Sequence, residues 1–172
     1  MRKSIFYFTL ILVSSLYLVG CSSSSGKSIS SFEGTGKYTF GFLEQVNVLD
    51  GEQLIKYFAS TNDIDKYLTE TYSGDKSKNA IYRRVADEQA EWPNYLYTSI
   101  YNLKRNAAMM GIEWNKITYL DFVAKQPLGE GPYVGEVFFK YGDSVYSVQT
   151  ELIKIDGDYY LSNLSGIQKV SR

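Results

Sequence analysis

The chain has 172 residues, of which 18 are Lys or Arg and 19 are Asp or Glu, so its net charge is close to neutral. This balance, without a concentrated basic face, argues against nucleic acid as a partner, while a hydrophobic content of 44% and an aromatic content of 16% exclude a disordered chain. The sequence contains no histidine and a single cysteine, Cys21, which excludes catalytic triads built on histidine and zinc sites built on several thiolates.

The first twenty residues have the layout of a secretory signal peptide. Arg2-Lys3 gives a positive start, and residues 5–19 form an apolar run that is shorter than the ~20 residues a membrane span needs. The end of this run, Leu18-Val19-Gly20-Cys21, resembles the lipobox of bacterial lipoproteins. The resemblance implies diacylglycerol on the Cys21 sulfur, cleavage after Gly20 and an acylated mature N-terminus. The alternative is an ordinary secretory signal with an incidental cysteine.

A lipidated Cys21 places the mature protein in the cell envelope, held to a membrane by its lipid. Ser22 in the position after the cysteine implies the outer membrane if the cell is Gram-negative. Removal of residues 1–20 leaves 16 basic and 19 acidic residues, a net charge of −3, and enough chain for one domain. We expect residues 21–34, rich in Ser and Gly, to form a flexible tether of about 20 Å, and residues 35–172 to form a single α+β domain.

The first part of the domain contains a predicted strand and two short predicted helices. Aromatic residues alternate with polar or small ones over residues 37–43, which predicts a half-buried strand. Asp50 as N-cap and Gln53 three residues later form the sequence pattern of a capping box and predict a helix start. A second helix is predicted over residues 62–72.

A longer helical region follows. Residues 76–91 are charged and carry apolar residues at helical spacing, and Pro93 then interrupts, so we expect either two helices that meet at Pro93 or one helix kinked there. Beyond the proline, apolar residues recur at intervals of four, three, four and three: Leu96, Ile100, Leu103, Ala107 and Met110. This stripe predicts an amphipathic helix with a buried face, and Gly111 is placed to end it.

The rest of the chain alternates with a period of two and predicts an antiparallel meander. Its four strands are expected within residues 112–125, 134–141, 145–155 and 159–170. In the first strand, one side is predicted to be lined by Thr118, Leu120, Phe122 and Ala124. Gly142-Asp143 and Asp156-Gly157 mark the last two turns, and the second is the stronger signal, because a type I′ turn requires positive φ at both central residues. Helices should cover one face of the sheet.

The order of strand, helices and meander, together with the hairpin at residues 155–161, resembles the cystatin-like arrangement and, more loosely, the nuclear-transport-factor-2-like cone. Both resemblances imply an α+β domain in which a curved sheet wraps a helix. The helices come first in the cone, so the strand predicted at residues 37–43 favours the cystatin-like version. Neither resemblance carries functional residues over to this chain.

Acidic residues supply the candidate chemistry. Asp121, with Tyr119 beside it, could face the concave side of the sheet as an acid in a pocket, but the alternation favours an Asp121 that faces water, on the side opposite to Leu120 and Phe122. Residues 62–65 have acid spacing reminiscent of a calcium loop, but Tyr67 stands where the next oxygen ligand belongs, and a helix N-terminus is the alternative. Asp156 and Asp158 flank a turn that favours such residues. No metal or cofactor is predicted.

Two further groups of side chains are candidate surfaces. Four basic residues surround Tyr82 and form either a solvated helix face or a patch for anionic lipid headgroups: Lys76, Lys78, Arg83 and Arg84. The chain also has 16 tyrosines, a residue type common at half-exposed sheet positions and at binding surfaces. The candidate binding surface consists of four of them on the meander: Tyr141, Tyr146, Tyr159 and Tyr160.

Three functions fit these observations. The leading hypothesis is a lipid-anchored binding or assembly module of the cell envelope, without catalytic activity, whose partner is an envelope protein. The alternative is a small-ligand pocket protein or an unconventional enzyme in a cone-shaped fold that uses Tyr119 and Asp121. A mainly structural envelope protein is the third.

Overall fold

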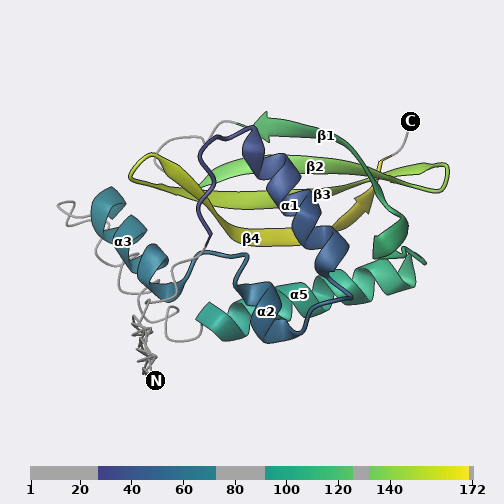
Figure 1. Ribbon diagram of the computed structural model, residues 1–172, viewed down its shortest axis with the longest axis horizontal. Coiled ribbons are helices and arrows are strands. Elements are labelled where there is room, and N and C mark those ends of the chain that lie inside the picture. The colour runs from purple at the N-terminus through teal and green to yellow at the C-terminus, as the bar shows by residue number, and fades with distance from the viewer. Residues whose placement is uncertain (1–26, 73–91, 126–131, 171–172) are drawn as a thin grey trace, which may run out of the picture.

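The computed structural model describes residues 27–72, 92–125 and 132–170 (Figure 1). Helices come first among these residues: α1 (Gly34–Gln45), α2 (Gly51–Ile55), α3 (Thr61–Tyr72) and α5 (Trp92–Met109), followed by the short 3-10 helix η1 (Trp114–Lys116). The strands follow: β1 (Thr118–Lys125), β2 (Tyr133–Tyr141), β3 (Ser144–Ile155) and β4 (Asp158–Lys169). They pair antiparallel in the order β1-β2-β3-β4. The predicted α+β architecture with a four-stranded meander is confirmed.

Both hairpin turns that the sequence predicted between the last three strands are present. Asp156 and Gly157 have φ of 52° and 95° and connect Ile155 to its partner Asp158, as a type I′ turn requires. Gly142 has φ of 58° in the other two-residue connection. These turns set the register of β2, β3 and β4.

The helix starting after Asp50 has the predicted capping box. The Gln53 N–H donates to Asp50 Oδ1 at 2.8 Å, and the Asp50 N–H donates to Gln53 Oε1 at 3.2 Å. Each bond satisfies a backbone donor that the helix leaves without a partner. The local sequence therefore fixes where α2 starts.

Helix α5 buries most of the predicted stripe and lies along β4, where Gly166 faces Asn106. Four of its residues are buried: Leu96, Ile100, Leu103 and Ala107. The prediction was wrong for Met110, which is 41% exposed. The helix ends at Met109, and Gly111, with φ of 67°, redirects the chain. Ile112 is buried instead, and its N–H donates to the carbonyl of Ala107 at 2.9 Å.

The strand predicted at residues 37–43 is wrong, because this segment lies inside helix α1. Its fully buried side chains, Thr39, Phe42 and Leu43, recur at helical spacing, and the C-cap residue Val46 continues the same side. The aromatic residues that suggested alternation pack in different directions around the helix: the ring of Tyr38 lies 5.6 Å from that of Tyr57, and the ring of Phe40 lies 5.4 Å from that of Tyr119. With a helix first, the reason to prefer the cystatin-like version disappears.

A bulge in β1 corrects the predicted strand face. The register shifts between Tyr119, which pairs with Phe139, and Asp121, which pairs with Phe138. Leu120 is therefore an extra residue, and it is 46% exposed instead of buried. The bulge brings Tyr119 and Phe122 to the same side, where both contact the position of Gly36 in α1.

Helices pack on the sheet in two clusters. The main core lies between the sheet and helices α1 and α5, and Figure 1 shows α1 crossing in front of the strands. A smaller cluster joins Ile64 and Leu68 of α3 to Ile153 and Ile155 of β3. Leu152 belongs to the main core and Ile153 to the smaller cluster. Because neighbouring strand residues point to opposite faces, α3 packs on the face of the β3–β4 hairpin opposite to the main core.

Two short segments cover the free edge of β4 near its start. Ile29 and Tyr159 exchange two backbone hydrogen bonds of 2.8 Å, and the N–H of Ala59 donates to the carbonyl of Leu161 at 2.7 Å. Ile29 is buried, so the folded domain includes residues from the end of the segment 21–34 that was predicted to be a tether. Covered in this way, the edge has fewer free groups for pairing with another chain.

Candidate functional site

The two predicted pocket residues, Tyr119 and Asp121, have different surroundings in the structure. The Tyr119 ring is half-buried against Phe40, and burial raises the pKa of its phenol, with a further contribution from the Asp121 carboxylate. Asp121 is exposed, and its Oδ1 accepts a hydrogen bond of 2.8 Å from the N–H of Phe122. Asp121 thus faces water, the orientation that the sequence favoured.

The four predicted surface tyrosines do not form one surface. Tyr146 is 7% exposed, and its ring stacks on that of Phe139 at 5.8 Å. Tyr141, next to the β2–β3 turn, donates its hydroxyl to Glu113 Oε1 at 3.2 Å. Tyr159 stacks on Phe32 at the other end of β3, and Tyr160 packs beside the α3 cluster. Tyr141 and Tyr146 are thus separated from Tyr159 and Tyr160 by the length of a strand, and Tyr146 is buried.

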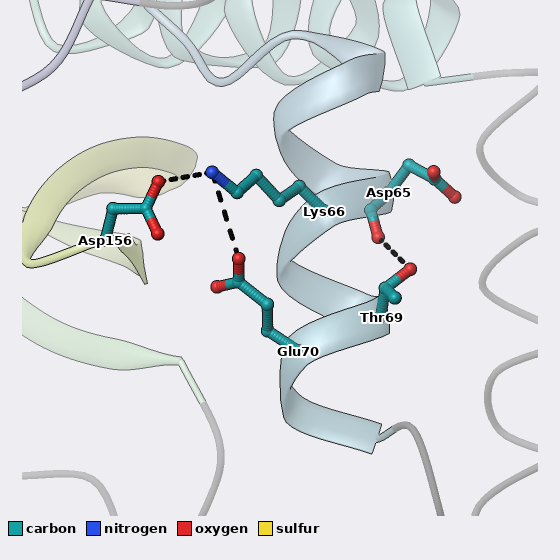
Figure 2. A network of polar contacts seen from close by, with 5 residues as sticks. All are labelled: Asp65, Lys66, Thr69, Glu70 and Asp156. Atoms are coloured by element: carbon teal, nitrogen blue, oxygen red, sulfur yellow. Dashed lines mark hydrogen bonds and ion pairs between the residues drawn. The ribbon is translucent and has the colours of Figure 1, made fainter.

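The acidic residues near α3 have structural partners. Asp63 Oδ2 accepts from the N–H and the hydroxyl of Ser60, at 2.8 and 2.7 Å, which caps the start of α3. Lys66 pairs with Asp156 in the hairpin turn and lies 3.9 Å from Glu70 (Figure 2). The hydrogen bond to Asp156 raises the pKa of the Lys66 ammonium. This network attaches α3 to the β3–β4 hairpin, and the described residues hold no cluster suited to a metal ion.

Several predicted features lie outside the described residues: Cys21, the signal segment before it, and the basic group around Tyr82. Among the helices that are described, none combines the length and the apolar character required to cross a membrane.

A partly open groove lies between α2 and the beginning of α5, and we call it the α2–α5 groove. Its cavity volume is about 370 Å³. Phe58, Ala59 and Leu96 are buried residues at its floor. Trp92, which is half-buried, and Tyr97, which is exposed, also line it. The remaining lining residues are Glu52, Ile55, Lys56, Ser60, Thr61 and Pro93.

Specific contacts hold the aromatic walls of the groove. The Trp92 Nε1–H donates to the carbonyl of Ala59 at 2.9 Å, and its ring stacks on Tyr95 at 5.5 Å. Tyr97 lies against Gly51, where an added Cβ would come within 2.8 Å of the ring. Gly51 therefore lets the tyrosine lie close to α2. The capping box that starts α2 thereby also positions one wall of the groove.

The chemistry of the α2–α5 groove suits binding. Its lining is mainly apolar and aromatic, and the charged Glu52 and Lys56 are exposed residues of α2 and its C-cap. The Ser60 hydroxyl is already used to cap α3 through Asp63. Such a groove can hold an apolar side chain, with charged groups at the rim for polar flanking residues.

Exposed aromatic area continues from the groove along α5. Tyr97 and Tyr101 are 38% and 63% exposed and are four residues apart, so they lie on the same face of the helix. The sequence stripe identified the buried face of α5, and the spacing of Tyr97 and Tyr101 was the available signal for the exposed one. That α2 lies beside this face was not predictable from either segment alone.

Comparison with known proteins gave no match: no family model, no curated protein and no solved structure matches this chain.

Proposed function

We propose that this protein is a lipid-anchored binding or assembly module of the cell envelope, without catalytic activity, and that the α2–α5 groove binds an envelope protein. The observation that carries the proposal is the groove, whose exposed wall residue Tyr97 is followed along α5 by the exposed Tyr101. Aromatic residues around an apolar depression are typical of the central contacts of protein interfaces. Acylation of Cys21 would hold this surface close to a membrane.

Anchoring by Cys21 is tested by Cys21→Ala in a bacterial host supplied with a labelled fatty acid. The wild type should take up the label and sediment with membranes, and the variant should do neither. Two or three acyl chains, at about 0.8 kcal/mol per buried CH₂, give a stable anchor, where one chain binds only marginally. Equal labelling and partition of the two proteins would refute the lipid anchor.

Binding at the groove is tested with a photoreactive amino acid at position 97 in intact cells, and with Tyr101→Ala in the same background. We expect a discrete protein adduct whose yield falls severalfold in Tyr101→Ala, because this exposed ring can be removed without disturbing the core. Val123→Ala, which truncates an exposed residue of β1, is the matched control and should leave the yield unchanged. Absence of any adduct would refute a protein partner at this groove.

A small-ligand binding protein is the second candidate, because about 370 Å³ falls within the size range of ligand pockets. Native mass spectrometry of the purified protein distinguishes the two. A stoichiometric bound small molecule that is lost when an exposed lining residue is enlarged, as in Thr61→Trp, would favour this candidate.

A further inference from the structure

The N-terminal segment determines which end of the domain lies near the membrane. Ile29 is buried and exchanges two hydrogen bonds of 2.8 Å with Tyr159 at the start of β4. Ile29 lies eight positions after Cys21, and eight Cα-to-Cα steps span at most about 26–29 Å even when the chain is fully extended. If Cys21 is acylated, the start of β4 therefore stays within about 30 Å of the lipid surface.

The α2–α5 groove lies at this same end. Phe58, which lines its floor, pairs with Leu161 on the edge of β4 that Ile29 also covers, two residues from Tyr159. Two strand residues extend about 7 Å. The groove floor therefore lies within roughly 35 Å of the acylated cysteine. Figure 1 shows the N-terminal segment, in purple, and the segment leading to α3, in teal, meeting beside β4.

The opposite end of the sheet is much farther from the anchor. Strand β3 has 12 residues between the Asp156-Gly157 turn and the Gly142-Asp143 turn, which corresponds to about 36–40 Å. The connection between Cys21 and Ile29 is shorter than this. The end of the domain that carries the groove therefore cannot be the end farthest from the membrane.

We infer that the occupant of the α2–α5 groove is a juxtamembrane segment of a protein embedded in the same membrane, an inference that rests on the proposed function. Only segments within roughly 35 Å of the lipid surface reach the groove floor. The lining requires an apolar side chain in that segment, and Glu52 and Lys56 are placed for polar residues that flank it. Confinement to one surface raises the effective concentration of the two partners, so a small interface is sufficient.

The test uses the full chain in its native envelope, with the photoreactive amino acid at position 97 and an insertion of about thirty Gly and Ser residues after Ser23. Lengthening the connection by this amount lowers the effective concentration about tenfold, since it falls with the −3/2 power of linker length. We expect the adduct yield to fall accordingly. The same insertion after Arg172 is the matched control and should leave the yield unchanged. Peptide mapping should place the adduct within about 10 residues of a membrane-spanning segment of the partner, the number that an extended chain needs to span about 35 Å.

The outcomes separate this inference from the proposed function. The inference is overturned by an adduct to a soluble protein, to a domain far from the membrane or to a lipid. It is also overturned if the insertion after Ser23 leaves the adduct yield unchanged. The first two kinds of adduct leave the proposed binding function intact. Mass spectrometry that finds Cys21 without acyl groups, or the absence of any adduct at position 97, overturns both.

Discussion

Replacement of Leu103 by alanine tests the packing of α5 on the sheet. Leu103 is 1% exposed in the main core. The substitution removes three buried carbons, worth about 2.4 kcal/mol at ~0.8 kcal/mol each. An unrelaxed cavity of roughly 80 Å³ adds about 1.9 kcal/mol at ~24 cal/mol per Å³. The better helix propensity of alanine returns only about 0.2 kcal/mol. We therefore expect the free energy of unfolding to fall by about 4 kcal/mol, within the ~2–5 kcal/mol range for such sites.

The assay is urea unfolding of the mature chain carrying Cys21→Ser, followed by tryptophan fluorescence. Trp114 is 2% exposed and reports on the core. Equal m-values for wild type and variant would show that the change lies in stability and not in the denatured state. Met109→Ala is the matched control, because Met109 is 71% exposed on the same helix, and it should change the stability by no more than about 0.5 kcal/mol. A Leu103→Ala effect below about 0.5 kcal/mol would refute the packing of α5 described above.

Three further predictions use the same assay. Gly135→Ala should lower the free energy of unfolding by about 1–3 kcal/mol or more, since the new Cβ would lie 2.3 Å from an aromatic ring of β1. Gly41→Ala, where nothing lies within 4 Å, should be neutral or stabilising by about 0.5–1 kcal/mol; a more stable Gly135→Ala than Gly41→Ala would contradict the close β1–β2 packing. Gly157→Ala should lower the free energy of unfolding by about 1–3 kcal/mol, because φ is 95° at this position; an unchanged urea midpoint would argue against the turn. Burial raises the pKa of Tyr38 above its ordinary value, so its stabilising contribution is complete below about pH 10 and is lost as the pH rises above it. Tyr38→Phe removes the hydrogen bond of 2.9 Å that the Tyr38 hydroxyl donates to the carbonyl of Tyr57; the free energy of unfolding should fall by about 1 kcal/mol at pH 7 and depend less on pH above about 10, and an unchanged pH dependence of the unfolding midpoint would contradict this.

Local signals in the sequence were sufficient for a large part of the fold. Positive φ at Asp156 and Gly157 requires residues that tolerate it, and the chain supplies them at that point. The capping box at Asp50 depends on residues three apart, and the buried stripe of α5 depends on the helical period. Each of these features is determined by neighbours in the sequence, so each could be predicted without knowing the tertiary structure.

The candidate site was only partly predictable. Tyr97 was recognisable as a helix residue, but the sequence directed attention to meander tyrosines, of which Tyr146 proved to be buried. The residues that matter for the groove come from α2, from the segment around Phe58 and from α5. Their assembly depends on contacts between segments distant in the chain, such as the hydrogen bond from Trp92 to Ala59.

Only the tertiary structure decided the state of residues 37–43. Alternating aromatic residues there are compatible with a strand, yet the segment is helical, and its aromatic side chains pack against Tyr57 on one side and Tyr119 on another. Gly36 makes this packing possible, since the Phe122 side chain occupies the space that a Cβ would need. In the same way, the bulge at Leu120 and the pairing of Ile29 with Tyr159 depend on partners distant in the sequence. Short-range periodicity cannot encode these choices, because the free energy that determines them comes from long-range packing and edge hydrogen bonds.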